Sequence, residues 1–491
     1  MEKYQFVVIG GGISGVTCVE SIATFNPTAQ ILLLTGTPLI KAITNYVKLT
    51  KFLEEFDIEE KPFNYLAEQY SNLIIKNKVV ERLDTDKQII FCMDNSQIQY
   101  DQLCICTGAR PKLLANSNPY VLGIRDTETV ESFQKKLTSA KQILIVGNGG
   151  IATELVYEIE HCSVIWAIKD EHISTTFFDE AAARFFLDRI EIVKEQQKLN
   201  EKRQKYEITE IPSELQNNHT TSLKICGGAL GPDWATGRSM KGALSEPRQV
   251  HIEYQVEVKN ILTPELYQKR TSTTENLQLS EEHIQWPVYV ELTNGKIIGC
   301  DFVVSAIGVT PNVETFLQSA NFKLGTDGGL LVDERMCTSI KNIFACGDVC
   351  SAGWTLTEQW FQMRLWSQAR QMGHYAGKCM LAYANNQQDS LTMDFCFELF
   401  AHTTKFFNMK VVLLGRYHEN DMKKYENLIR MTPGVEYIRV TLKDGRVHGC
   451  VFIGDTELEE TFENLILNQI DVSSYGETLL DPNIDIADYF D

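Results

Sequence analysis

The chain of 491 residues lacks a CxxC pair, a membrane-length apolar run and an excess of basic charge. No Cys/His spacing matches a zinc site, and we predict no metal site. No window approaches about 20 apolar residues, so no membrane-spanning helix is expected. Lys and Arg total 46 against 65 Asp and Glu, a net charge of −19 that disfavours direct binding to nucleic acid. The start "MEKYQFVVIGGG" lacks the regions of a signal peptide, and we expect a soluble intracellular protein.

A first nucleotide-binding turn is predicted in "QFVVIGGGISGVTCVESIA", an apolar strand followed by a glycine turn and a helix. Gly10, Gly12 and Gly15 match the GxGxxG pattern, which permits a tight turn, close approach of a pyrophosphate and close helix packing. The helix N-terminus then offers free N–H groups to the phosphates. The next strand ends at Thr35 instead of an acidic residue, so ribose contact comes from Thr35, from backbone, or is lost.

The motif recurs in "KQILIVGNGGIATELVYEIE", where Gly147, Gly149 and Ala152 follow a β-branched strand and open a helix. Two such turns in one chain predict two nucleotide-binding domains and two cofactors. Lys169 follows the next strand, where a cation can meet the 2′-phosphate of NADPH. A solvated lysine explains this residue equally well, so the choice between NADH and NADPH stays open.

Two further stretches, "YDQLCICTGARPKL" and "CDFVVSAIGVTPNVE", share an Asp, an apolar strand, a small-Gly turn and a nearby Pro. We predict that they leave each nucleotide-binding domain and cross to the other. Their turns make Thr107, Gly108 and Gly308 cofactor-binding candidates.

The stretch "FACGDVC" ends another apolar run and places Cys346 and Cys350 around Gly347 and Asp348. The two cysteines could form a redox disulfide, hold a metal or be bystanders. A carboxylate at a strand end beside a helix N-terminus can hold a ribityl hydroxyl, with the helix dipole facing a flavin. We expect that helix to open at Trp354.

The order of these motifs (GxGxxG, TGAxP, GxGxxA, AIGVTPN, FAxGD) resembles the pyridine nucleotide-disulphide oxidoreductases over residues 1 to about 385. The resemblance implies an α/β fold with two Rossmann-like domains, FAD on the first, NAD(P)H on the second, and hydride transfer between them. It implies FAD contacts at Gly10, Gly12, Gly15 and Asp348, and NAD(P)H contacts at Gly147, Gly149 and Ala152.

The chain departs from this family where the thiol chemistry belongs. The family's disulphide reductases carry reactive cysteines on the helix after the second strand, or a CxxC in the second domain. Here residues 38–55, "PLIKAITNYVKLTKFLEE", contain no cysteine. Lys41, Thr44 and Asn45 occupy the region that should face the flavin, and the catalytic residue stays unknown.

This departure bears on "FACGDVC". We predict that Gly347 and Asp348 are its functional part and that Cys346 and Cys350 are structural thiols. The other cysteines, out of 13 in all, are expected to be small core residues. Disulphide reductase activity is then absent or marginal.

A closer resemblance, to a branch of the family without redox-active cysteines, spans nearly the whole chain. It is carried by "NPYVLGIRDT", "GALGPDW", "FELFAHTTKFFNMKVVLLG", "EETFENLILNQ" and "LLDPNIDIADYFD". It implies a cytoplasmic and nuclear FAD protein that oxidises NAD(P)H. It also implies association with the tRNA ligase complex, which the protein would protect from oxidation.

The predicted domains alternate along the chain. The FAD-binding domain takes residues 1–124 and 313–388, the NAD(P)H-binding domain 125–312 with a polar insertion at about 190–285, and an α+β domain 389–491. Within the insertion, "GGALGPDWATG" covers the nicotinamide side or presents a surface to a partner. The last domain, predicted to contain a hairpin with an Asp-Gly turn and an acidic tail, dimerises or binds another protein. The oligomeric state stays open.

Two functions compete. One is an NAD(P)H-oxidising flavoenzyme that uses oxygen or a quinone-like acceptor, or protects a partner. The other is a redox-responsive binding module whose bound nucleotide sets its conformation and whose turnover is incidental.

Overall fold

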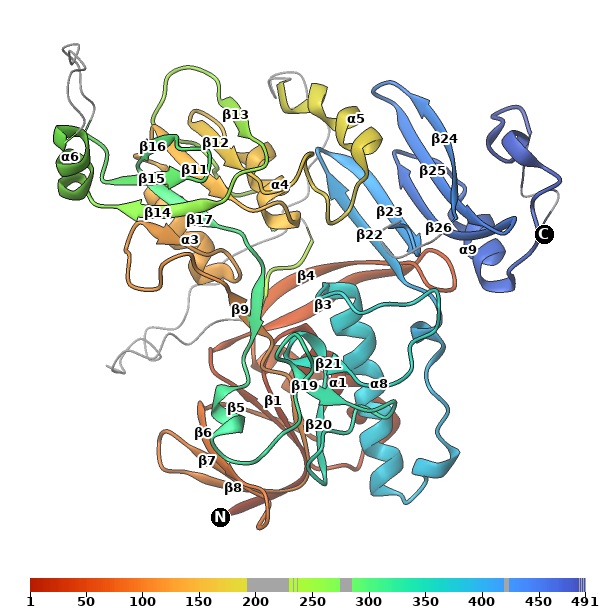
Figure 1. The fold of residues 1–491 in the computed structure, drawn as a ribbon. Coiled ribbons are helices and arrows are strands. Elements are labelled where there is room, and N and C mark those ends of the chain that lie inside the picture. Colours follow the sequence, from red (N-terminus) through yellow and green to blue (C-terminus); the bar gives the residue numbers. More distant parts are fainter. Residues whose placement is uncertain are drawn as a thin grey trace.

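The computed structural model describes residues 1–191, 229–273, 285–418 and 424–484, except 233 and 236, together with 486, 488 and 490. Two dinucleotide-binding domains and a C-terminal α+β domain make up the molecule, which confirms the predicted fold class (Figure 1). The first domain lies at the bottom of Figure 1, the second at the upper left and the C-terminal sheet at the upper right. Within these described ranges, no helix is long and apolar enough to cross a membrane.

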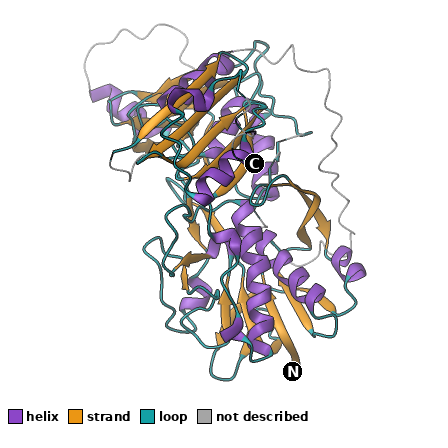
Figure 2. Cartoon of the chain, turned by 90° about the vertical axis from the view of Figure 1, so that its right-hand side faces the viewer, coloured by secondary structure: helices purple, strands orange, loops and turns teal. Residues whose placement is uncertain are grey.

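The first domain is built on a sheet whose central strand is β1 (Glu2–Ile9). Phe6, Val7 and Val8 are fully buried, because both faces of a parallel sheet are covered. The strand order is β5-β2-β1-β8-β7-β6, and β20 also pairs with β8. Helices α1 and α8 lie side by side against this sheet (Figure 2). The other bounds are β2 Ile31–Thr35, β5 Leu73–Asn77, β6 Val80–Asp84, β7 Ile89–Cys92, β8 Gln97–Ile105, β20 Ile343–Ala345, α1 Ile13–Phe25, α2 Asn64–Gln69, α7 Glu314–Leu317 and α8 Trp366–Ala384. A small parallel pair joins β19 Leu330–Val332 to β21 Cys350–Ala352.

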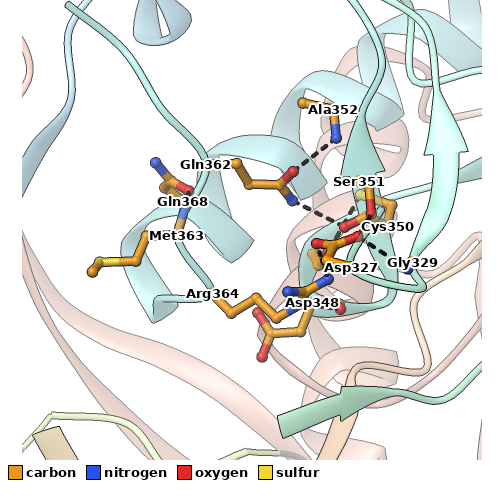
Figure 3. Close-up of polar contacts among 11 residues, drawn as sticks. Asp327, Gly329, Asp348, Cys350, Ser351, Ala352, Gln362, Met363, Arg364 and Gln368 are labelled. Atoms are coloured by element: carbon orange, nitrogen blue, oxygen red, sulfur yellow. Dashed lines mark hydrogen bonds and ion pairs between the residues drawn. The ribbon is translucent and has the colours of Figure 1, made fainter. Parts of the chain in front are cut away.

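Helix α8 begins at Trp366, and the expectation that a helix opens at Trp354 is wrong. The Gln362 side chain accepts from the Ala352 amide at 2.7 Å and donates to the Cys350 carbonyl at 2.9 Å (Figure 3). These bonds hold the segment before α8 along β21 in a non-helical path.

The region of residues 38–55 is a β-hairpin, where the family resemblance suggested a helix. Strands β3 (Leu39–Lys48) and β4 (Glu54–Pro62) pair in antiparallel fashion. At the tip, the Lys51 amide donates to the Glu463 carboxylate at 3.0 Å. The hairpin therefore connects the first domain to the C-terminal domain (Figure 1).

The second domain contains a parallel sheet of order β10-β17-β11-β12-β13, with an antiparallel sheet β14-β15-β16 beside it. The two domains are joined where β9 (Ala109–Pro111) pairs with β18 (Val309–Pro311), as the crossing-strand prediction requires. The bounds are β10 Val121–Leu122, β11 Gln142–Val146, β12 Ser163–Ala167, β13 Gln249–Glu253, β14 Val258–Leu262, β15 Val288–Leu292, β16 Ile297–Cys300, β17 Phe302–Ser305, α3 Thr127–Leu137, α4 Gly150–Glu158, α5 Glu180–Glu191 and α6 Pro264–Thr273.

The polar insertion predicted at about 190–285 includes part of this core. Strand β13 lies inside that range and pairs with β12 in parallel, with Val250 opposite Val164. The basic run "KEQQKLNEKRQKYE" lies outside the described residues.

The C-terminal domain is an antiparallel sheet of order β22-β23-β26-β25-β24 with helix α9 against it. Asp444 and Gly445 have φ of 51° and 71° and form the tight turn between β25 and β26, which confirms the predicted Asp-Gly hairpin. The bounds are β22 Ala401–Phe406, β23 Met409–Gly415, β24 Glu426–Thr432, β25 Glu436–Lys443, β26 Arg446–Ile453 and α9 Glu459–Asn468.

Candidate functional site

A single cavity of about 1810 Å³ runs between the two dinucleotide turns. Residues from all three domains line it. Most of the predicted cofactor-binding residues are among them: Gly10, Gly12, Thr35, Thr107, Gly108, Gly147, Gly149, Lys169, Gly308 and Asp348.

The first turn leaves a space bounded by backbone. Gly10 has φ of +123°, and a Cβ there would lie 2.2 Å from the Cys106 carbonyl oxygen. A Cβ on Gly15 would lie 1.9 Å from the Gly10 carbonyl oxygen, so Gly15 serves helix packing and is not part of the cavity wall. Gly12 is the N-cap of α1 and offers no side-chain cap, which leaves helix N–H groups to a ligand. These features fit the pyrophosphate of a dinucleotide.

The second turn repeats this geometry. Gly147 has φ of +128°, and a Cβ there would lie 2.2 Å from the Ala306 carbonyl oxygen. Gly149 is the N-cap of α4, and a Cβ on it would meet no protein atom within 4 Å. Because Gly149 has no side chain, it leaves this part of the cavity open. Ala152 is fully buried and packs in the core behind the turn, away from the cavity.

Threonines beside the first turn are already engaged by backbone. The Thr35 hydroxyl donates to the Thr37 carbonyl at 2.8 Å, and the Thr107 hydroxyl donates to the Asn312 carbonyl at 2.9 Å. Gly108 and Gly308, at the crossing strands, have φ of +63° and +100°. These two glycines shape the backbone where the strands cross between the domains, and they offer no side chain to a cofactor.

Asp348 lies in the short connection between β20 and β21 and forms an ion pair with Arg125. Each side chain is only 11% exposed. Arg364 donates to the Asp348 carbonyl oxygen at 2.8 Å and to the Asp327 carboxylate at 2.6 Å (Figure 3). Gly347 is required here because its φ is +77° and a Cβ would lie 2.5 Å from the Ser14 hydroxyl. The two arginines fix the Asp348 backbone and carboxylate beside the cavity.

The flavin-proximal candidates Lys41, Thr44 and Asn45 do not line the cavity. They lie on β3 and pair across the hairpin with acidic residues of β4. Lys41 is 2% exposed and its Nζ lies 2.5 Å from Glu60. Thr44 donates to Glu59 at 2.8 Å. The strand geometry of this region turns these side chains towards β4.

Sequence reasoning missed three cavity residues whose importance depends on tertiary contacts. Arg125 directly precedes the capping box that begins α3 at Asp126, which fixes its position at the domain crossing. Glu154 lies on α4, and its carboxylate accepts the indole N–H of Trp234 at 2.5 Å. Both line the cavity, as does His402 of the C-terminal domain. The "GALGPDW" stretch ends at Trp234, the partner of Glu154, and was the available signal in the sequence for this contact.

His402 brings the C-terminal domain into the site. Its Nδ1 lies 3.0 Å from the Ser367 hydroxyl, and its ring lies 5.0 Å from that of Trp366, at the N-terminus of α8. Complete burial lowers the pKa of His402 to about 3. Its Nε2 has no hydrogen-bond partner among the described residues. A neutral imidazole with one ring nitrogen available thus borders the cavity.

The cysteines of "FACGDVC" do not pair with each other. The Cys350 thiol donates to the Gly347 carbonyl at 3.2 Å, while Cys346 contacts the thiols of Cys104 and Cys106. All cysteines in the described part of the chain are free thiols.

Known proteins match the chain over its whole length. A family model described as pyridine nucleotide-disulphide oxidoreductase matches residues 4–216 and 257–373, and one described as rubredoxin NAD+ reductase C-terminal domain matches residues 401–470. The chain is 51% identical over 493 residues to pyridine nucleotide-disulfide oxidoreductase domain-containing protein 1 of Homo sapiens, covering 99% of this chain and 98% of that one. It is 42% identical to the Drosophila melanogaster protein of that name, over 100% of both. These matches confirm the closer resemblance.

Solved structures share the fold. A ferredoxin reductase for the CYP199A2 system from Rhodopseudomonas palustris superposes with a TM-score of 0.67 at 16% identity, covering 99% of this chain and 100% of that one. A NAD-dependent persulfide reductase from A. fulgidus gives a TM-score of 0.62 at 17% identity, covering 96% and 78%. At these identities the likeness concerns the fold alone.

Proposed function

This chain belongs to the pyridine nucleotide-disulphide oxidoreductase family, and from that premise we propose that it oxidises NAD(P)H through FAD without a redox dithiol. It is a pyridine nucleotide-dependent flavoprotein oxidoreductase whose cofactors are FAD and NAD(P)H. The observation that carries the proposal is one cavity joining both dinucleotide turns, in whose described lining Cys106 is the only cysteine. The neighbouring thiols of Cys104 and Cys346 are fully buried behind Cys106, so no pair of cysteines faces the cavity for disulphide exchange.

The chain's own residues divide the work between two halves of the cavity. The N-termini of α1 and α4 bind the two pyrophosphates through free N–H groups. Asp348, held by Arg125, accepts hydroxyl hydrogen bonds on the first side. Bound FAD supplies a two-electron acceptor for the nicotinamide hydride. His402 stays neutral because it is buried, so it adds no positive charge to the site.

The test is anaerobic mixing of the FAD-loaded protein with NADH and NADPH, followed by oxygen. Rapid bleaching of the flavin and its return with oxygen support an oxidase-type enzyme. Binding of nucleotide without bleaching would support the alternative, a nucleotide-responsive binding module. Robust turnover of glutathione or thioredoxin disulphide that disappears in Cys346→Ser would contradict the dithiol-free mechanism.

We also propose that the protein protects a partner, such as the tRNA ligase complex, from oxidative inactivation. The similarity over the full chain length to pyridine nucleotide-disulfide oxidoreductase domain-containing protein 1 supports this. Purified ligase complex would be incubated in oxygenated buffer with NADPH and this protein. Ligase activity should survive with the intact protein and decay with a variant that cannot bind NADPH. Equal decay in both would refute the proposal.

Residence in the cytoplasm and nucleus is proposed on the same ground. Fractionation of cells carrying a tagged copy tests it, and confinement to another compartment would refute it.

A further inference from the structure

Three cysteine thiols lie in contact beneath the first dinucleotide turn. Cys104 belongs to β8, Cys106 directly follows it, and Cys346 directly follows the neighbouring parallel strand β20. The Sγ atoms are 3.3 Å apart for Cys106 and Cys346, 3.5 Å for Cys106 and Cys104, and 3.7 Å for Cys104 and Cys346. None of these residues is more than 3% exposed. These three residues are called the thiol cluster.

The strand geometry explains why the sequence did not reveal this cluster. Cys104 lies on β8 and Cys106 follows directly after that strand, two residues on, so their side chains share a face of the sheet. Ala345 pairs with Ile105, and continuing that register puts Cys346 beside Cys106. The absence of a metal-ligand spacing along the chain therefore did not exclude a site built across strands.

The triangle of sulfurs suits a small thiophilic cation. At a metal–sulfur distance of about 2.3 Å from all three, the cation would sit about 1 Å out of the sulfur plane. A pyramidal arrangement of this kind leaves a fourth position. Cys18 of α1 is also buried, but its sulfur does not lie within 4.8 Å of all three sulfurs of the thiol cluster. It also lies 3.9 Å from the Met380 sulfur.

Burial raises the pKa of the Cys104 and Cys106 thiols, while hydrogen bonds from Cys104 and Cys106 lower the pKa of the Cys346 thiol. Soft sulfur donors select Zn²⁺ and Cu⁺ over hard cations, and these metals displace thiol protons.

We propose that Cys104, Cys106 and Cys346 bind a thiophilic d¹⁰ cation, Zn²⁺ or Cu⁺. Binding forms one metal–sulfur bond per cysteine, and each thiolate formed releases its proton to solvent. Access is from the dinucleotide cavity, which Cys106 lines. Since the Cys106 carbonyl also packs against Gly10, the cation would stiffen the first turn.

The test measures metal content of the full-length, FAD-loaded protein. Samples are equilibrated with Zn²⁺, or anaerobically with Cu⁺, dialysed against a competing chelator and analysed by mass spectrometry for metal per chain. We expect about one ion in the unmodified protein and at least roughly tenfold less in Cys104→Ala and Cys346→Ala. The matched control is Cys350→Ala, a buried thiol nearby that donates to backbone and should keep the full metal content. Whether the sample equilibrated with Zn²⁺ or the one equilibrated with Cu⁺ retains its metal identifies the cation.

Two results overturn the proposal. One is loss of both metals from the unmodified protein on dialysis, and the other is equal metal content in cluster variants and control. If the variants fail to fold, as judged by lost FAD absorbance, X-ray absorption of the metal-loaded unmodified protein decides. Three or four sulfur neighbours at about 2.3 Å support the site, and oxygen or nitrogen neighbours refute it.

Discussion

Trp234 donates its indole N–H to the Glu154 carboxylate at 2.5 Å and so ties the segment after residue 228 to helix α4. The same segment reaches the first domain, because a Cβ on Gly231 would lie 2.3 Å from the Ile58 side chain of β4, and the Leu230 amide donates to the Arg125 carbonyl at 2.8 Å at the domain crossing. It therefore borders the cavity on the side of the second turn while contacting the crossing between domains.

Replacing Trp234 with Phe should weaken NAD(P)H binding and spare FAD. The change removes a hydrogen bond to a carboxylate, worth about 1.5–3 kcal/mol, and loosens the attachment of the segment to α4. We expect a roughly 5–10-fold rise in the NAD(P)H dissociation constant, measured by fluorescence titration. The control is Trp286→Phe, which lies in the same domain but not on the cavity. Equal effects of the two variants would argue against a role for the indole N–H.

The two turn glycines should respond differently to a branched side chain. Gly149→Val introduces carbon into open space, so folding and FAD content should be preserved while NAD(P)H binding falls. Gly10→Val forces a Cβ to within 2.2 Å of a carbonyl oxygen and should cost FAD and stability together. Stopped-flow reduction reports the outcome. The flavin of the Gly149 variant should stay oxidised with NAD(P)H and still bleach with dithionite. If NAD(P)H reduced that flavin at the parent rate, the proposed second nucleotide site would be refuted.

Asp348→Ala should lower both FAD retention and stability. It leaves the Arg125 guanidinium buried without its carboxylate, at a cost of about 2–4 kcal/mol. The comparison is Asp327→Asn, whose carboxylate is 39% exposed in its pair with Arg364 and should cost less than about 1 kcal/mol. FAD content after gel filtration and urea unfolding measure the two effects. Similar losses in both variants would contradict a special role for the Arg125–Asp348 pair.

His402 should make the fold sensitive to acid. Its pKa is lowered to about 3 in the folded protein against an ordinary 6.5. Between pH 3 and pH 6.5 the unfolded chain binds a proton at His402 that the folded chain does not. The contribution of neutral His402 to the free energy of unfolding is therefore fully present above pH 6.5 and is lost as the pH falls. We expect about 3 kcal/mol of loss from pH 6.5 to pH 4. His402→Gln should flatten that slope in urea unfolding at a series of pH values. Identical slopes would refute the assignment.

Lys169 tests the nucleotide preference. It lines the cavity two residues beyond the end of β12. If its cation meets a 2′-phosphate, Lys169→Glu should lower the ratio of NADPH to NADH reduction rates several-fold. An unchanged ratio would identify Lys169 as a solvated surface residue.

The sequence by itself determined the two dinucleotide turns. Gly10 and Gly147 are required by local backbone geometry, since each has a positive φ and a carbonyl oxygen within 2.2 Å of its missing Cβ. Such constraints act over a few residues and leave a readable pattern. The uniformly apolar strand β1 and the Asp-Gly hairpin were predictable for the same reason.

Only the tertiary structure decided which side chains meet in the cavity and in the core. Lys41 was a flavin-side candidate by position along the chain, yet β-pairing turns it towards Glu60. His402 reaches the cavity from a domain that the pattern assigned to an interface, and Cys346 meets Cys106 across two strands. Cys106 and Cys346 are 240 positions apart, and no local propensity encodes their contact. These contacts arise from the packing of three domains around one cavity.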